Sequence, residues 1–141
     1  MLCPLAESQA ASPEGDRVPA SFSVRIRRRD MSGSWRVGRG IDISSGGFGF
    51  ALPGNDAPLL NDEYVVELML NFTRTQKEMF EMAAQVRRVS IKEREVVVGM
   101  FVSDPAHRKK LAAAVSRLQH LMVRQPEDYL LVETHRPRLG F

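Results

Sequence analysis

The sequence predicts a mainly β fold, a barrel or sandwich of six short strands, with one α-helix near the C-terminal end. Six short segments rich in β-branched and aromatic residues are separated by segments rich in Gly, Pro, Asn and Asp, which is typical of strands joined by turns. A longer stretch with apolar residues at helical spacing follows the last of them. A parallel α/β fold would need helices between its strands, and a closed barrel leaves no exposed strand edge.

The first strand is expected at Ser21–Arg27, because Phe22, Val24 and Ile26 alternate with polar residues and give it one apolar face. The sequence Ser32-Gly33-Ser34 is typical of a turn. The second strand is then expected from about Trp35 to Ile43, with these residues directed inward: Trp35, Val37 and Ile41.

Three further strands follow from the same criteria, at Phe48–Leu52, Glu63–Phe72 and Glu95–Val102. The segment Met79–Val89 is ambiguous, because much of it has a helix-forming composition. It is interpreted as a strand, since its apolar residues fall on one face at period two: Phe80, Met82, Ala84 and Val86.

One helix is expected after the last strand. Asp104 is suited to cap its N-terminus, and Pro105 is suited to its first turn. Pro126 ends it by about Gln125. Four apolar residues recur at helical spacing and define the face expected to pack on the barrel: Leu111, Val115, Leu118 and Met122.

The composition is that of a soluble globular protein, and 141 residues suit one domain. A single cysteine excludes a disulfide within one chain, and no apolar run is long enough to span a membrane. The start of the chain lacks the features of a secretory signal, so a cytoplasmic location is expected. We expect a flexible N-terminal arm at 1–16, a barrel with its helix at 17–124, and a C-terminal tail at 125–141.

The motifs of several enzyme classes are missing, including the phosphate-binding loop, the dinucleotide fingerprint and the nucleophile elbow. The three histidines do not cluster with carboxylates at the spacing of metal ligands. The chain is therefore expected to be neither an enzyme nor a metalloprotein.

The segment Asp42-Ile43-Ser44-Ser45-Gly46-Gly47 is the first candidate site. Asp42 and Ser44 lie two apart at a strand end, so their side chains share a face. Gly46 and Gly47 permit positive φ and close approach of a ligand to the backbone. The carboxylate can accept from the edge of a guanine, and the hydroxyl and amides can donate to a phosphate. A plain hairpin turn with two glycines at its corner is the alternative.

The second candidate is a concentration of arginines in the first third of the chain: Arg17, Arg25, Arg27, Arg28, Arg29, Arg36 and Arg39. Arginine binds phosphate or guanine through a planar fork and stacks on bases. A solvated barrel face is the alternative. The net charge of +3 and the lack of aromatic residues among Arg25 to Arg29 argue against nucleic acid as the ligand.

The segment from Asp42 to Phe50 resembles the D/N-x-S-x-x-G motif of PilZ domains, with Asp42, Ser44 and Gly47 at its fixed positions. Two later segments agree in character, 85–89 and 98–102, and the helix follows in the expected place. The resemblance extends over about Arg17 to Met122. It implies a six-stranded antiparallel β-barrel with a C-terminal α-helix, and it implies a bacterial receptor for the second messenger cyclic di-GMP.

By this resemblance the ligand-binding residues are Arg17, Asp42, Ser44, Gly46 and Gly47. The family's other motif, R-x-x-x-R, precedes the first strand and is incomplete here; either Arg25 or Arg27 would compensate if it faces the ligand, and Arg25 is added to the site on that ground. The register that places Arg17 at its second arginine puts Pro13 at the first. Arg25 and Arg29 match the spacing as well, but leave too little chain before Asp42.

The expected partners are cyclic di-GMP and an unidentified protein, and the chain is expected to be a monomer or a dimer. Binding would change the conformation of the chain and regulate motility, pili or exopolysaccharide. The incomplete arginine motif favours an alternative, a protein-protein adaptor of the same fold that has lost nucleotide binding.

Overall fold

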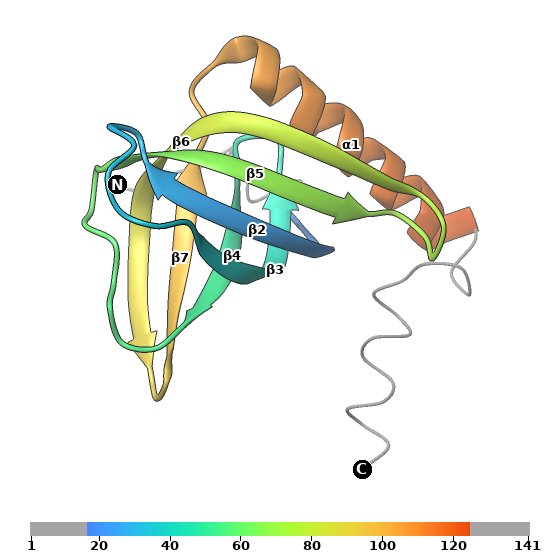
Figure 1. Ribbon diagram of the computed structural model, residues 1–141. Helices are drawn as coiled ribbons and strands as arrows, with labels where there is room; N and C mark the ends of the chain where they lie inside the picture. The colour runs from blue at the N-terminus through green and yellow to red at the C-terminus, as the bar shows by residue number, and fades with distance from the viewer. Residues whose placement is uncertain (1–16, 125–141) are drawn as a thin grey trace, which may run out of the picture.

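The computed structural model describes residues 17–124, and the segments expected to be an arm and a tail lie outside them. Seven strands and one helix follow one another (Figure 1): β1 Val18–Pro19, β2 Ser21–Arg28, β3 Arg36–Ser44, β4 Gly47–Pro53, β5 Glu63–Asn71, β6 Lys77–Lys92, β7 Glu95–Phe101 and α1 Pro105–Arg124. Each predicted strand is present, and each ends within three residues of its predicted bounds.

Six of the strands close into an antiparallel barrel. The sheet runs in the order β3-β2-β5-β6-β7-β4, and a further pairing of β3 with β4 closes it. The two-residue β1 adds to the outer edge of β3 through the pairs Val18 with Ile43 and Pro19 with Asp42. Figure 1 shows β2 and β5 running across the front of β3, β4 and β7. The predicted barrel with its C-terminal helix is confirmed.

The apolar faces of the strands meet in one core. Phe22, Val24 and Ile26 of β2 are buried, as the alternation predicts. The ambiguous segment is strand throughout, and its period-two face is buried: Phe80, Met82, Ala84 and Val86. Long β6 pairs with β5 through its first half and with β7 through its second, so it bends from one side of the barrel to the other.

The predicted inward face of β3 is wrong. Val37 is 62% exposed, whereas Gly38 is buried. Trp35 is half-buried beneath the guanidinium of Arg25, 4.4 Å from the ring centroid, and Ile41 is only partly buried. These three large apolar residues therefore lie off the core, and Gly38 fills an inward position because β4 lies too close for a side chain.

The helix begins as predicted. Asp104 accepts a hydrogen bond from the amide of Ala106 through Oδ1 at 2.8 Å, which caps the N-terminus. Leu111, Val115 and Leu118 are buried in the core, but Met122 is 38% exposed and Leu121 is buried in its place. In Figure 1, α1 lies along the upper right of the barrel. Within residues 17–124 no helix is long and apolar enough to cross a membrane.

Candidate functional site

Two β-bulges shape one outer surface of the barrel. The pairing of β3 with β4 shifts between Gly40 and Asp42, and the pairing of β6 with β7 shifts between Val86 and Arg88. A bulge adds one residue to one strand and so reverses which face the following side chains take. As a result Ile43 enters the core while Asp42 faces outward, and Val86 is buried while Arg88 is exposed.

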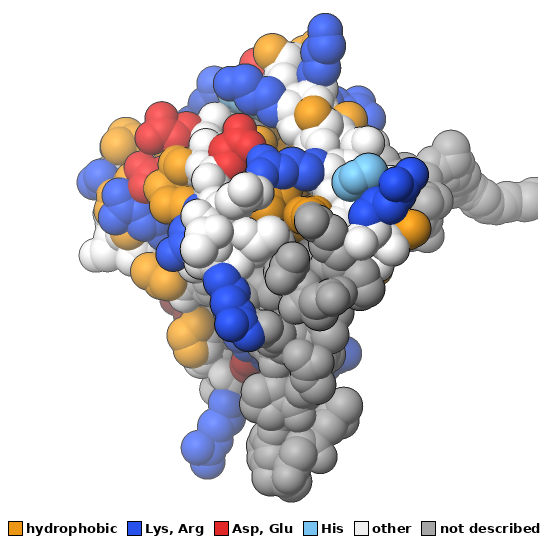
Figure 2. Space-filling view, turned by 90° about the vertical axis from the view of Figure 1, so that its right-hand side faces the viewer, with side chains coloured by type: hydrophobic (Ala, Val, Ile, Leu, Met, Phe, Trp, Pro, Cys, Tyr) orange, Lys and Arg blue, Asp and Glu red, His pale blue; other side chains and the backbone are white. Residues whose placement is uncertain are grey.

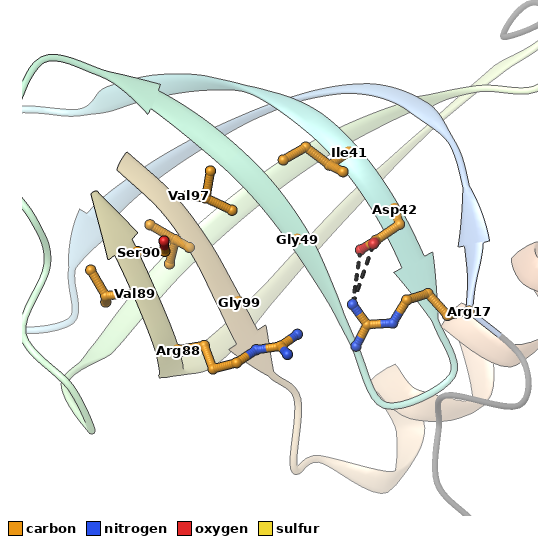
Figure 3. A pocket seen from close by; sticks show the side chains of 10 residues that line it. Arg17, Ile41, Asp42, Gly49, Arg88, Val89, Ser90, Val97 and Gly99 are labelled. Atoms are coloured by element: carbon orange, nitrogen blue, oxygen red, sulfur yellow. Dashed lines mark hydrogen bonds and ion pairs between the residues drawn. The ribbon is translucent and has the colours of Figure 1, made fainter. Parts of the chain in front are cut away.

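The bulges align four residues across four neighbouring strands. Asp42 of β3 pairs with Gly49 of β4, Gly49 pairs with Gly99 of β7, and Gly99 pairs with Arg88 of β6. We call this row the glycine trough, because its two central positions carry no side chain. Figure 3 shows Asp42 on one side of the trough and the Arg88 side chain on the other. The hollow over the trough has a volume of about 290 Å³.

The charges at the trough are mainly positive. Arg17 donates from Nη1 to both carboxylate oxygens of Asp42, at 3.4 and 3.3 Å (Figure 3). The two side chains are 35% and 23% exposed, so the pair is accessible to a ligand. Arg88 lies against Gly99 and has no ion pair or hydrogen-bond partner within the described part of the chain. One free guanidinium and one paired guanidinium thus flank a floor of bare backbone.

The turn from β3 to β4 borders the trough. Ser44 is 4% exposed, and its Oγ accepts from the amide of Gly46 at 3.2 Å and donates to the carbonyl of Gly47 at 3.4 Å. Gly47 does not have a positive φ. It is required because a Cβ there would lie 2.0 Å from the carbonyl oxygen of Met100. Close packing of β4 on β7, and not an unusual backbone conformation, therefore accounts for this glycine.

A second, connected hollow of about 200 Å³ lies over this turn, and Arg17 and Arg88 line both hollows. Phe101 forms part of its wall. The guanidinium of Arg87 lies 4.4 Å from the ring centroid of Phe101, and that of Arg108 on α1 lies 5.4 Å from it. The turn, Arg87 of β6 and the start of the helix thus meet at one aromatic ring.

The structure brings together five of the predicted site residues: Arg17, Asp42, Ser44, Gly46 and Gly47. It does not bring Arg25 to them. Arg25 donates from Nε to Glu67 Oε1 at 2.6 Å and stacks on Trp35, and it lines neither hollow. The ion pair raises the pKa of Arg25, so it stays charged and paired. Pro13, at the other predicted motif position, lies outside the described residues.

Sequence reasoning did not assign Arg88, Gly49 or Gly99 to the site. A signal for them existed, because a tandem of arginines inside a strand and a glycine inside the β-branched run of β7 both break the strand pattern. Only the two bulges turn these irregularities toward Asp42.

The run from Arg25 to Arg29 is largely neutralised by β5 and the residue before it. Besides the pair of Arg25 with Glu67, Arg28 pairs with Asp62 at 3.0 Å, and Arg29 pairs with Glu63. On the face shown in Figure 2, Lys and Arg side chains are interspersed with acidic and apolar ones. These arrangements argue against a continuous basic surface for nucleic acid.

The family model of the PilZ domain matches residues 14–117, which is more than half of the chain. No curated protein matches the sequence. The fold is similar to the PilZ domain of YcgR from Escherichia coli with c-di-GMP, with a TM-score of 0.61 and 15% identity over 79% of this chain and 94% of that one.

Two further solved structures share the fold. The Bacillus subtilis inhibitor of motility MotI is 18% identical with a TM-score of 0.58, over 77% of this chain and 51% of that one. MrkH of K. pneumonia, in its apo state, is 16% identical with a TM-score of 0.55, over 84% of this chain and 56% of that one. The matched region spans only about half of these two longer proteins. At such low identity the structural similarity establishes the fold alone.

Proposed function

This chain belongs to the PilZ domain family, and from that premise we propose that it is a non-enzymatic receptor for cyclic di-GMP. The observation that carries the proposal is the glycine trough, where Asp42 and Arg88 face a backbone floor from opposite sides. Cyclic di-GMP offers two phosphates and two guanine edges, which match cationic and carboxylate groups respectively. The PilZ domain of YcgR, which has this fold, was solved with c-di-GMP.

Each residue of the site has a role that follows from its chemistry. The Asp42 carboxylate accepts hydrogen bonds from the Watson–Crick edge of a guanine. Arg17, already held beside Asp42, turns part of its fork to a phosphate. Ser44 holds the turn so that the amides around Gly46 and Gly47 meet the ligand backbone. Arg88 offers its free guanidinium to a phosphate or a base face from the opposite wall.

Arg88 also bears on the incomplete arginine motif. Where Pro13 stands at the first motif position, the ligand loses one arginine contact, typically worth about 1–3 kcal/mol or roughly 5- to 150-fold in affinity. Arg88 supplies a second cation at the trough and offsets part of that loss. We therefore expect binding that is weaker than two motif arginines would give, but measurable.

The output of binding is a change in the segment that precedes β1. Arg17 is the last residue before β1, so a ligand that engages Arg17 also fixes the chain leading into it. This ordering would create or hide a surface for a protein partner, in control of motility, pili or exopolysaccharide. A cytoplasmic site of action follows from the proposed ligand.

A second candidate function is a protein-protein adaptor that does not bind the nucleotide. One observation favours it: apart from Arg88, the charged and hydroxyl side chains of the site are already paired with neighbouring groups. Arg17 neutralises Asp42, and the Ser44 hydroxyl both donates and accepts within its own turn. MotI, which has this fold, is described as an inhibitor of motility.

Calorimetric titration with cyclic di-GMP distinguishes the two functions. The receptor proposal predicts saturable heat with the wild-type chain and an affinity at least fivefold weaker in Arg88→Gln. Arg94→Gln is the matched control. It removes one positive charge from the same β6–β7 hairpin, but Arg94 lines neither hollow. Absence of heat at millimolar ligand would support the adaptor and contradict the receptor.

A further inference from the structure

The seven arginines between positions 17 and 39 differ in whether a carboxylate neutralises them. Five of the seven form ion pairs with carboxylates: Arg17 with Asp42, Arg25 with Glu67, Arg28 with Asp62, Arg29 with Glu63 and Arg39 with Glu95. Within residues 17–124, Arg27 and Arg36 have no such pair. Both unpaired arginines line the same hollow.

This hollow lies between the loop from β2 to β3, at 29–35, and the loop from β4 to β5, at 54–62, and we call it the loop hollow. Its volume is about 480 Å³, and it shares no lining residue with the two hollows at the glycine trough. The buried residues Ile26 and Tyr64 form its floor, and three apolar residues of the second loop line one wall: Ala57, Pro58 and Leu59. The loop hollow is thus distinct from the proposed nucleotide site.

Arg36 is the cation best placed in it. It is the first residue of β3, directly opposite Ile26 in the register, and it is half-buried. It shares a strand face with buried Gly38, whereas Arg39 is on the other face and pairs with Glu95. A half-buried guanidinium without a carboxylate is costly, because water and counter-charge are both partly withdrawn from it. An anion bound in the hollow would remove that cost.

The rest of the lining is suited to the same anion. Arg27 donates from Nε to the carbonyl of Gly33 at 3.1 Å, which leaves its two terminal nitrogens for a ligand. Arg28 is already neutralised by Asp62, which raises the pKa of that arginine. Asp56 is the one acidic residue among the lining residues described, and it does not pair with either free arginine. Arg28 also lies 3.9 Å from Asp30, so two carboxylates, Asp62 and Asp30, neutralise it from behind the lining. Of the three arginines on the lining, Arg27 and Arg36 are therefore the two without a carboxylate partner in the described part of the chain.

The loop that carries the hollow is held in shape by its own backbone. Met31 and Gly33 both have positive φ, at 67° and 76°. The amide of Ser32 donates to Asp30 Oδ1 at 2.8 Å. Hydrogen bonds from the Ser32 hydroxyl, chiefly, and from this amide lower the pKa of Asp30. The loop places the hydroxyl of Ser34 on the lining, where it can donate to an anion.

We propose that the loop hollow is a second binding site, for a small organic anion whose phosphate or carboxylate contacts Arg27 and Arg36 and whose apolar part packs on Ala57, Pro58 and Leu59. The arginine forks match either anionic group. A volume of about 480 Å³ exceeds what a bare phosphate needs and lies in the range of pockets for small organic molecules. The site does not depend on cyclic di-GMP binding at the trough.

Amide NMR of the full chain tests the proposal with three probes of similar size: phenyl phosphate, benzoate and neutral benzyl alcohol. The two anions are expected to cause saturable shifts in the loops at 29–35 and 54–62, and benzyl alcohol is expected to cause none. The anion that binds more tightly identifies the preferred group. Arg36→Gln should weaken binding about tenfold, and Arg36→Lys, which keeps the charge without the fork, should weaken it less.

Three controls make the result decisive. Arg39→Gln, which changes the charge on the opposite face of the same strand, should leave the anion affinity unchanged. Asp42→Asn, at the trough, should also leave it unchanged, which separates this site from the nucleotide site. Arg27→Gln provides a second variant if Arg36→Gln fails to fold. Equal shifts with benzyl alcohol, no saturable shift with either anion, or an unchanged affinity in the folded arginine variants would overturn the proposal.

Discussion

Adding one methyl group at the centre of the trough should separate ligand binding from stability. A Cβ at Gly99 would approach the Arg88 side chain at 3.4 Å, which is close to ordinary van der Waals contact, and φ at Gly99 is not positive. Gly99→Ala should therefore fold, and removing a glycine from a strand should gain up to about 0.5–1 kcal/mol of unfolding free energy. The methyl would occupy the floor on which the ligand rests. Obstruction of this size in a pocket typically costs about 1–3 kcal/mol, so we expect cyclic di-GMP affinity to fall roughly 10- to 100-fold.

The neighbouring glycine provides a matched comparison. A Cβ at Gly49 would lie 2.8 Å from Asp42 Oδ1, so Gly49→Ala must displace that carboxylate and strain its pair with Arg17. It should weaken binding at least as much as Gly99→Ala, with a loss of stability below about 1 kcal/mol, because the pair is exposed. Urea unfolding and calorimetric titration measure the two quantities. If Gly99→Ala bound the nucleotide as tightly as the wild type, the trough would not be the binding surface.

Three further outcomes follow from the structure. Asp42→Asn should lower cyclic di-GMP affinity about tenfold in calorimetry. The unfolding free energy should change by less than about 1 kcal/mol, because the ion pair of Asp42 with Arg17 is exposed, and a larger loss of stability would mean that Asp42 has a structural role. Gly47→Ala should lower the unfolding free energy by about 1–3 kcal/mol in urea, because its methyl overlaps the Met100 carbonyl, and an unchanged midpoint would contradict the close packing of β4 on β7. Leu118→Ala, at a fully buried position of α1, should lower the unfolding free energy by about 2–5 kcal/mol, measured by urea unfolding followed by circular dichroism. A smaller loss would mean that the helix does not pack into the barrel core.

Much of the fold could be predicted because alternation reports burial directly. In β2 and in the first half of β6, one face of the strand is buried along its whole length. There the alternation of apolar and polar residues predicts both the strand and its inward residues. Asp42 and Ser44 were also placed on one face correctly, with Ile43 between them fully buried. Local chemistry likewise predicted the Asp104 cap of the helix.

The errors arise where structure depends on more than one strand. In β3 the inward positions include Gly38, which no hydrophobicity pattern marks, and Val37 is exposed although its apolar side chain predicts a core position. The bulges that turn Asp42 and Arg88 outward depend on the pairing of two strands, so a break in the alternation of one strand does not show which residues come to lie across from one another. Nor could the partner of Arg25 be predicted, because Glu67 reaches it only through the register of β2 with β5.

An amide NMR titration with cyclic di-GMP tests most directly whether the trough is a nucleotide site. If the nucleotide binds at the trough, saturable shifts are expected at the amides of Gly46, Gly47, Gly49 and Gly99, with Arg88 and its neighbours in the same footprint. Asp42→Asn should shift the whole titration to higher ligand concentration without moving the footprint. Absence of saturable shifts, or a footprint confined to the loops at 29–35 and 54–62, would contradict binding at the trough.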